Sequence, residues 1–129
     1  MKRFVAAAIF VLGACVTDAN AQASRFTGKD LFEYCTSDQT SVAYFSCVLF
    51  IRGFLVGVNL TSTGTGRVSV PNSNMFLCLP NGLNAGLAAA AIVNSWRSIQ
   101  LTKGDVGPLE KAEADVVLPT LLMLAYPCK

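Results

Sequence analysis

An apolar stretch of 20 residues, Ser41 to Leu60, most constrains what this chain can fold into. It carries one charge, Arg52, and apolar residues occupy most of the circumference when it is drawn as a helix. A helix that is hydrophobic nearly all round is typical of a central, buried position. About 20 apolar residues also suffice to cross a bilayer, but a charge at mid-span is costly there. We therefore expect a central buried helix in a globular domain, with a membrane span as the alternative.

The N-terminus has the pattern of a secretory signal peptide. Lys2 and Arg3 are basic, and an apolar run from Phe4 to Ala14 follows them. The triplet Ala19-Asn20-Ala21 fits the small-x-small cleavage rule, and Ala21-Gln22-Ala23 is a second option. We predict a signal peptide at residues 1–21 and a single exported domain at residues 22–129, located in a bacterial periplasm.

A second interpretation of the leader is a lipoprotein signal. Leu12-Gly13-Ala14-Cys15 resembles a lipobox, in which Cys15 would be lipidated and become the first mature residue. Lipidation would tether the domain to a membrane face without changing its fold. Contact with a membrane is expected only in this case.

The four cysteines after the leader are Cys35, Cys47, Cys78 and Cys128. An even number in a small exported domain indicates two disulfides, with three connectivities open. A metal site is disfavoured because the chain has no C-x-x-C pair and no histidine. The order of the predicted helices, described next, favours Cys35–Cys47 across a helical hairpin and Cys78–Cys128 at one end of an antiparallel pair.

The local patterns predict four helices. The ranges are 28–37 with Thr27 and Asp30 as a capping box, 41–60, 85–100 with Asn84 as N-cap, and 109–126 with a kink at Pro119. The segment 61–74 is predicted to be a loop with a short extended piece at 67–70, and residues 75–80 an apolar segment held by Cys78. We expect an all-α fold, a small four-helix bundle stapled by disulfides.

The composition excludes several kinds of chemistry. The absence of histidine removes Ser-His-Asp and Cys-His catalysis. Glu110 and Glu113 could line one helix face like a glycosidase pair, but a solvated helix start is the favoured interpretation. We interpret Arg52 as structural, either paired with Asp115 or Glu33 or reaching the surface along its stem. A nearly balanced charge gives no indication of a nucleic-acid partner. We therefore expect a binding protein without a cofactor or small-molecule substrate.

Four segments together carry a resemblance to a known family. They are Thr27-Gly28-Lys29-Asp30-Leu31 with Tyr34-Cys35, Phe45-Ser46-Cys47 with Gly53, Phe76-Leu77-Cys78-Leu79-Pro80-Asn81-Gly82, and Ala125-Tyr126-Pro127-Cys128. In this order they resemble the Rap/Tai family of type VI secretion immunity proteins, over almost the whole exported domain.

The resemblance implies an all-helical periplasmic protein, often a homodimer, that binds and blocks a peptidoglycan amidase. In that family a protruding loop of the inhibitor can plug the catalytic cleft of the toxin. Carried onto this chain, the nearest candidate is the connector Leu101 to Pro108, with Thr102, Lys103, Gly104 and Asp105 as partner-binding residues. The alternative function is a small helical, disulfide-bonded envelope stress protein or chaperone.

Overall fold

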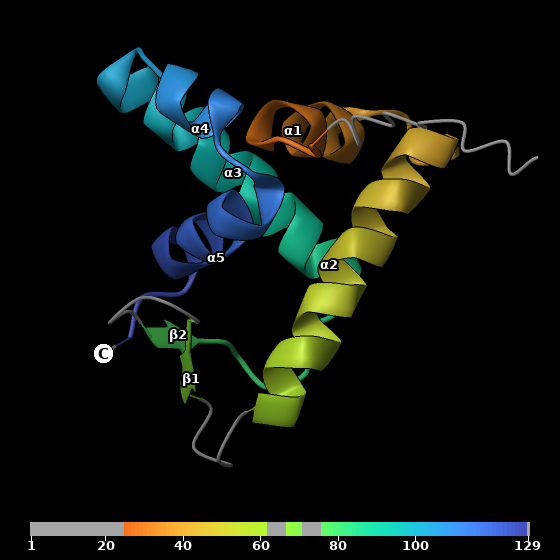
Figure 1. Ribbon diagram of the computed structural model, residues 1–129, viewed down its shortest axis with the longest axis vertical. Coiled ribbons are helices and arrows are strands. Elements are labelled where there is room, and N and C mark those ends of the chain that lie inside the picture. The colour runs from red at the N-terminus through yellow and green to blue at the C-terminus, as the bar shows by residue number, and fades with distance from the viewer. Residues whose placement is uncertain (1–24, 62–66, 71–75, 129) are drawn as a thin grey trace, which may run out of the picture.

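The computed structural model describes residues 25–61, 67–70 and 76–128. Within these ranges the elements follow in the order α1 (Gly28–Thr36), α2 (Val42–Thr61), β1 (Arg67–Ser69), β2 (Phe76–Cys78), α3 (Ala85–Lys103), α4 (Gly107–Lys111) and α5 (Ala114–Ala125). The fold is mainly helical, as predicted, but it also contains a small sheet (Figure 1). The predicted signal peptide with Cys15 and much of the 61–74 loop lie outside the described residues.

Helix α1 begins at the predicted capping box. The backbone N–H of Asp30 donates to Thr27 Oγ1 at 3.3 Å, and the backbone N–H of Thr27 donates to Asp30 Oδ2 at 2.8 Å. This reciprocal pair satisfies donors that the first turn of a helix leaves free. The hydrogen bond from the Thr27 backbone N–H, followed by that from its hydroxyl, lowers the pKa of the Asp30 carboxyl.

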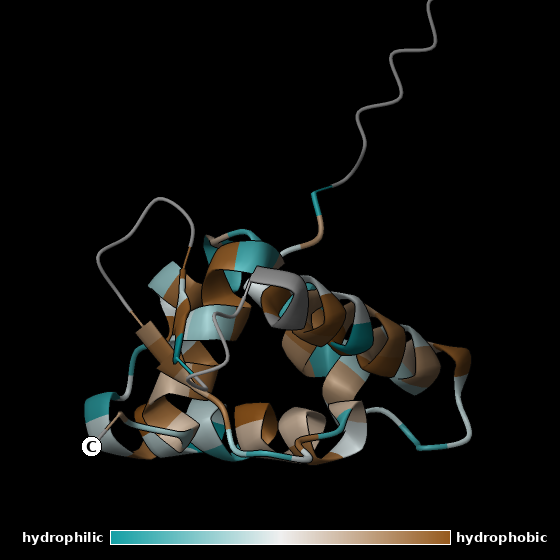
Figure 2. Cartoon of the chain, turned by 90° about the horizontal axis from the view of Figure 1, so that it is seen from below, coloured by the Kyte–Doolittle hydropathy of each residue, from teal (hydrophilic) through white to brown (hydrophobic). Residues whose placement is uncertain are grey.

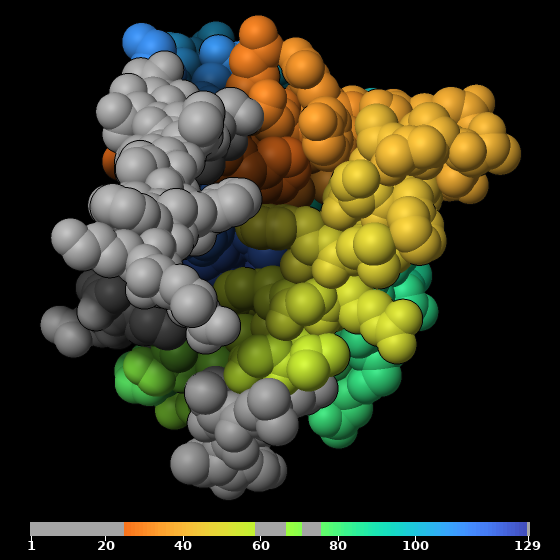
Figure 3. Space-filling view, turned by 45° about the vertical axis from the view of Figure 1, so that its right-hand side comes forward, coloured from red at the N-terminus to blue at the C-terminus, as the bar shows by residue number. Residues whose placement is uncertain are grey.

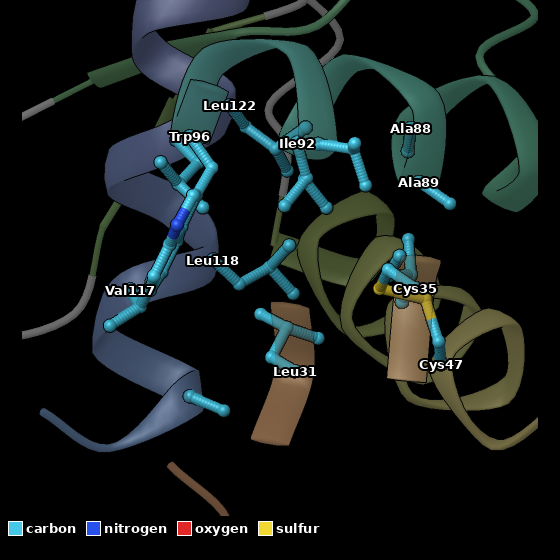
Figure 4. Packing of buried hydrophobic residues seen from close by; sticks show 14 of the residues in the cluster. Leu31, Cys35, Cys47, Ala88, Ala89, Ile92, Trp96, Val117, Leu118 and Leu122 are labelled. Atoms are coloured by element: carbon cyan, nitrogen blue, oxygen red, sulfur yellow. A yellow bond between two sulfur atoms is a disulfide. The ribbon is translucent and has the colours of Figure 1, made fainter. Parts of the chain in front are cut away.

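The core lies where α1, α3 and α5 meet. Leu31 of α1 points toward Leu118 of α5, and Ile92 of α3 lies beside Leu122 (Figure 4). Trp96 of α3 is also buried, and its ring stacks on that of Phe32 with the centroids 5.0 Å apart. Side chains from three helices therefore exclude water from one shared core, which is the expected source of stability in a domain of this size.

Both predicted disulfides are confirmed. Cys35–Cys47 joins the end of α1 to the start of α2, with the Cα atoms 5.3 Å apart. Cys78–Cys128 joins β2 to the segment after α5, with the Cα atoms 5.1 Å apart. The first bridge is buried, whereas Cys128 is exposed. Two disulfides are typical of a chain that folds in an oxidising compartment outside the cytoplasm.

The expectation that residues 41–60 form the central helix is wrong. α2 runs along one flank of the molecule, where it packs on α1, α3 and β1, while α3 packs on α1, α2 and α5 (Figure 1). Hydrophobic residues are spread over all the helices, α2 included (Figure 2). Composition alone therefore did not distinguish the central helix from the flanking one. No helix in the described part of the chain is both long and apolar enough to cross a membrane.

The predicted last helix, 109–126, is also wrong as a single element. It is divided into α4 and α5 because residues 112 and 113 are extended, and the backbone of residues 112–114 bonds to that of residues 26–28. The backbone N–H of Gly28 donates to the carbonyl of Ala112 at 2.8 Å, and that of Ala114 donates to the carbonyl of Phe26 at 2.9 Å. These bonds replace helical ones, so the break falls before Pro119, which lies inside α5.

The small sheet was not expected as a sheet. The extended piece predicted at 67–70 is present as β1, and the apolar segment 75–80 contains β2. The two strands are antiparallel, with Val68 opposite Leu77, and both of these side chains are buried. The Cys78–Cys128 bridge then ties this hairpin to the end of the chain.

Candidate partner-binding surface

The predicted partner-binding residues gather at the corner where α3 ends and α4 begins. α3 extends to Lys103, so Thr102 and Lys103 belong to its last turn rather than to a loop. Gly104 ends the helix in the left-handed conformation, with φ of 71°, and its N–H donates to the carbonyl of Gln100 at 3.0 Å. Glycine is favoured there because it has no Cβ to clash. The end of α3 therefore fixes the positions of Thr102 and Lys103.

Asp105 organises the second half of the corner. Its Oδ1 accepts a hydrogen bond from the backbone N–H of Gly107 at 2.8 Å, which turns the chain into α4 with Pro108 in the first turn. Val106 is buried between these exposed residues and holds the turn against the core. The corner is thus anchored from both sides, although residues 102–105 themselves are exposed.

One apolar side chain projects from this corner. Leu101, in the last turn of α3, is 88% exposed, the highest value among the exposed large hydrophobic residues of the described chain. Burying a leucine side chain on a partner is worth about 1.5–3 kcal/mol. Together with Lys103 and Asp105 it gives the corner one apolar and two oppositely charged contact groups.

A cavity of about 600 Å³ lies beside the corner, between α3, α4 and α5. Its lining residues are Ser95, Ser98, Ile99, Thr102, Lys103, Asp105, Pro108, Leu109, Thr120 and Leu124. The Thr102 hydroxyl donates to the carbonyl of Ser98 at 2.8 Å, and the Thr120 hydroxyl to that of Val116 at 3.0 Å. These two donors are therefore used within the helices. Ile99, Leu109 and Leu124 supply an apolar part of the wall, with the exposed Lys103 and Asp105 beside it.

The remaining charged candidates lie elsewhere. Glu113 precedes α5 and forms an ion pair with Arg25 at 2.9 Å, while Glu110 belongs to α4. Arg52 is exposed on α2 beside a cavity of about 420 Å³, and it takes part in neither of the two ion pairs seen among the described residues. Arg52 was predicted either to pair with a carboxylate or to reach the surface, and its side chain lies at the surface. No cluster of three or more possible metal ligands occurs in the described ranges.

The sequence predicted a connector at residues 101–108, but α3 continues to Lys103, and the cavity beside the turn was not predicted. Thr102, Lys103, Gly104 and Asp105 do come together, and three of them adjoin the hollow. Leu109, Thr120 and Leu124 complete it from α4 and α5, and no local pattern in the sequence marks these residues.

The chain matches no protein-family model, no curated protein and no solved structure.

Proposed function

We propose that this chain is an exported immunity-type protein that binds and occludes a peptidoglycan-degrading amidase of a type VI secretion system. The observation that carries the proposal is the α3–α4 corner, an exposed turn held against the core by the buried Val106, beside a cavity lined in part by Ile99, Leu109 and Leu124. The choice of an amidase as the target rests on the resemblance to the Rap/Tai family.

Inhibition in this proposal is steric. The corner enters the catalytic cleft of the amidase, and Leu101 is buried against the cleft wall while Lys103 and Asp105 pair with complementary charges. An apolar side chain from the rim of the amidase fills the cavity between α3, α4 and α5. A few well-buried contacts of this kind carry most of the affinity in protein complexes. The inhibitor needs neither a catalytic group nor a cofactor, because exclusion of the substrate is sufficient.

The proposed site of action is the periplasm. The two disulfides support an oxidising compartment, and the predicted signal peptide supplies a route to it. If Cys15 is lipidated instead, the same domain acts while tethered to a membrane.

The test is binding and inhibition with amidases encoded beside this chain. The exported protein and each amidase are co-expressed in the periplasm, purified together, and assayed for release of peptide from peptidoglycan. We expect a one-to-one assembly of inhibitor and enzyme subunits without hydrolytic activity. Binding of many unfolded proteins in place of one enzyme would instead favour the envelope chaperone, and no binding at all would refute the immunity function.

Variants of the corner locate the contact. Leu101→Asp and Lys103→Glu should each weaken binding by at least about tenfold, or 1.4 kcal/mol, because each removes a central contact. Leu87→Asp is the matched control, since Leu87 is another exposed leucine of α3, 57% accessible and about 21 Å away along the helix. Equal losses at Leu87 and Leu101 would show that the corner is not the contact site.

A further inference from the structure

A pocket of about 290 Å³ lies where the turn between α1 and α2 meets α3. Figure 3 shows this turn, in orange to yellow, projecting from the surface of the molecule. The buried part of the pocket wall consists of Cys35, Ala89 and Val93. Because Cys35 is bonded to Cys47, the ends of α1 and α2 beside the pocket are covalently held together. We call this hollow the hairpin pocket.

Three polar side chains that line the hairpin pocket have no partner within the described part of the protein. Asn94 and Arg97 are three positions apart, so they lie on one face of α3, and Tyr44 comes from α2. Asn94 and Arg97 are exposed, and Tyr44 is half-buried. None of the three side chains makes a hydrogen bond or an ion pair with a described residue. Together they offer a guanidinium, an amide and a hydroxyl, all of which can donate hydrogen bonds to an anion.

The charge of the hairpin pocket is positive. Arg97 is the only charged side chain among the described residues that line it, and no carboxylate is present there. The carbonyl groups at the end of α1 carry a partial negative charge, which would oppose an anion. Two of them are already engaged, since the Thr36 hydroxyl donates to the carbonyl of Phe32 at 2.8 Å and the Ser37 hydroxyl to that of Glu33 at 2.7 Å. The pocket therefore attracts an anionic group.

We propose that the hairpin pocket binds the C-terminal residue of a peptide, with the terminal carboxylate on Arg97, Asn94 and Tyr44 and the last side chain against Ala89 and Val93. A guanidinium binds a carboxylate through two parallel hydrogen bonds. Inorganic phosphate would use the same donors but would leave the apolar wall of Ala89 and Val93 uncovered. The proposal goes beyond the immunity function and does not depend on it.

The size of the hairpin pocket sets the expected length and affinity of the ligand. Its volume of about 290 Å³ is at the lower end of the range for ligand pockets, so it suits one or two small residues. N-acetyl-alanyl-alanine, which has about 14 non-hydrogen atoms, is a probe of this size. At the binding efficiency of a typical drug-sized ligand, a peptide of about 14 atoms binds with a dissociation constant on the order of 1 mM.

The first test is titration of this peptide into the nitrogen-15-labelled exported protein, followed by NMR. Amide shifts should change at residues 35–39 and 89–97, with the expected dissociation constant. The same peptide with a C-terminal amide, and inorganic phosphate, should each bind at least tenfold more weakly, because the first lacks the carboxylate and the second the apolar group. No binding of the acid, or equal binding of the acid and the amide or of the acid and phosphate, would overturn the proposal.

Alanyl-alanine with a free amine identifies the source of the ligand. Tighter binding of this dipeptide than of its acetylated form would indicate a short free peptide. Tighter binding of the acetylated form would indicate the C-terminus of a longer chain. Both results support a carboxylate site, provided that the amide binds more weakly than the acid.

Variants of the pocket test the assigned residues. Arg97→Ala should weaken binding of the acetylated peptide at least tenfold, and Tyr44→Phe should weaken it severalfold, because each removes a hydrogen bond to a charged group. Arg52→Ala is the matched control, since Arg52 is also exposed, makes no ion pair with a described residue and lies outside the hairpin pocket. This control should bind the peptide like the wild type. Equal losses in Arg97→Ala and Arg52→Ala would show that only overall charge attracts the peptide and would exclude the proposed site.

Discussion

Gly28→Ala should destabilise this domain more than its small size suggests. Gly28 is the first residue of α1 and is buried against α4 and α5. A Cβ at this position would overlap the carbonyl oxygen of Leu109 and would lie 2.9 Å from Cγ2 of Val117. The side chain of Val117 can rotate, but the Leu109 carbonyl is backbone and moves only with α4. The glycine is required here for space and not for its backbone dihedral angles.

The loss in the free energy of unfolding follows from the displacement of α4 that the added methyl group requires. Overpacking of a filled core costs about 1–3 kcal/mol, and we expect the upper end because backbone is displaced. Moving α4 away would also stretch the 2.8 Å bond from the Gly28 N–H to the carbonyl of Ala112. For a domain of about 100 residues, 3 kcal/mol lowers the melting temperature by roughly 10–20 °C.

Urea and thermal unfolding, followed by circular dichroism, measure this change in the free energy of unfolding. Gly53→Ala is the matched control, since Gly53 lies inside α2 with nothing within 4 Å of an added Cβ. Alanine there should stabilise the domain by about 0.5–1 kcal/mol, because it removes conformational freedom from the unfolded chain. A free energy of unfolding for Gly28→Ala within about 0.5 kcal/mol of the wild-type value, or an equal loss in Gly28→Ala and Gly53→Ala, would refute the reasoning.

Three further predictions concern the disulfides, the capping box and the core. By loop entropy, removing the Cys35–Cys47 disulfide should lower the free energy of unfolding by about 3 kcal/mol, and removing Cys78–Cys128 should lower it by about 4 kcal/mol. Under mild reductant the exposed Cys78–Cys128 bridge should open first, which thiol labelling with mass spectrometry would reveal. Asp30→Ala should lower the free energy of unfolding by about 1 kcal/mol at neutral pH, because it removes the carboxylate that accepts two hydrogen bonds from Thr27 in the capping box. These hydrogen bonds lower the folded-state pKa of Asp30 below its usual 3.8, so this stability is present above about pH 4 and is lost as the pH falls through the folded-state pKa, and the variant and the wild type should converge in acid unfolding curves. Trp96→Ala should lower the free energy of unfolding in urea by about 3–5 kcal/mol. Trp96→Phe should lower it by less than about 1 kcal/mol, because the indole Nε1 is buried with no hydrogen-bond partner among the described residues and its removal offsets the lost volume; a large loss in the phenylalanine variant would contradict this account.

Features set by neighbouring residues were predictable from the sequence. Thr27 and Asp30 are three positions apart and formed the capping box as expected, and the order of the helices was sufficient to pair the cysteines. The corner at Gly104 and Asp105 also depends on local hydrogen bonds, so its position was visible in advance.

Features set by distant residues were not predictable. The break before α5 exists because Ala112 and Ala114 bond to backbone near α1, more than 80 positions earlier. α2 is apolar on most of its surface, so its sequence does not indicate which face stays exposed. That face is determined by where α1, α3 and β1 pack against the helix. The cavity beside the corner is completed by Leu109 and Leu124, which become relevant only when three helices are packed together.

The backbone pairing between residues 26–28 and 112–114 also determines when this domain can finish folding. A ribosome or a secretion channel delivers the chain from its N-terminus, so α1 emerges long before the segment that pairs with it. Until residue 114 has appeared, the first helix lacks its long-range backbone partners, and Cys78 must wait for Cys128. Folding therefore depends on delivery of the chain through Cys128, and a copy interrupted before that residue presents an unpaired thiol at Cys78 to the oxidising machinery around it.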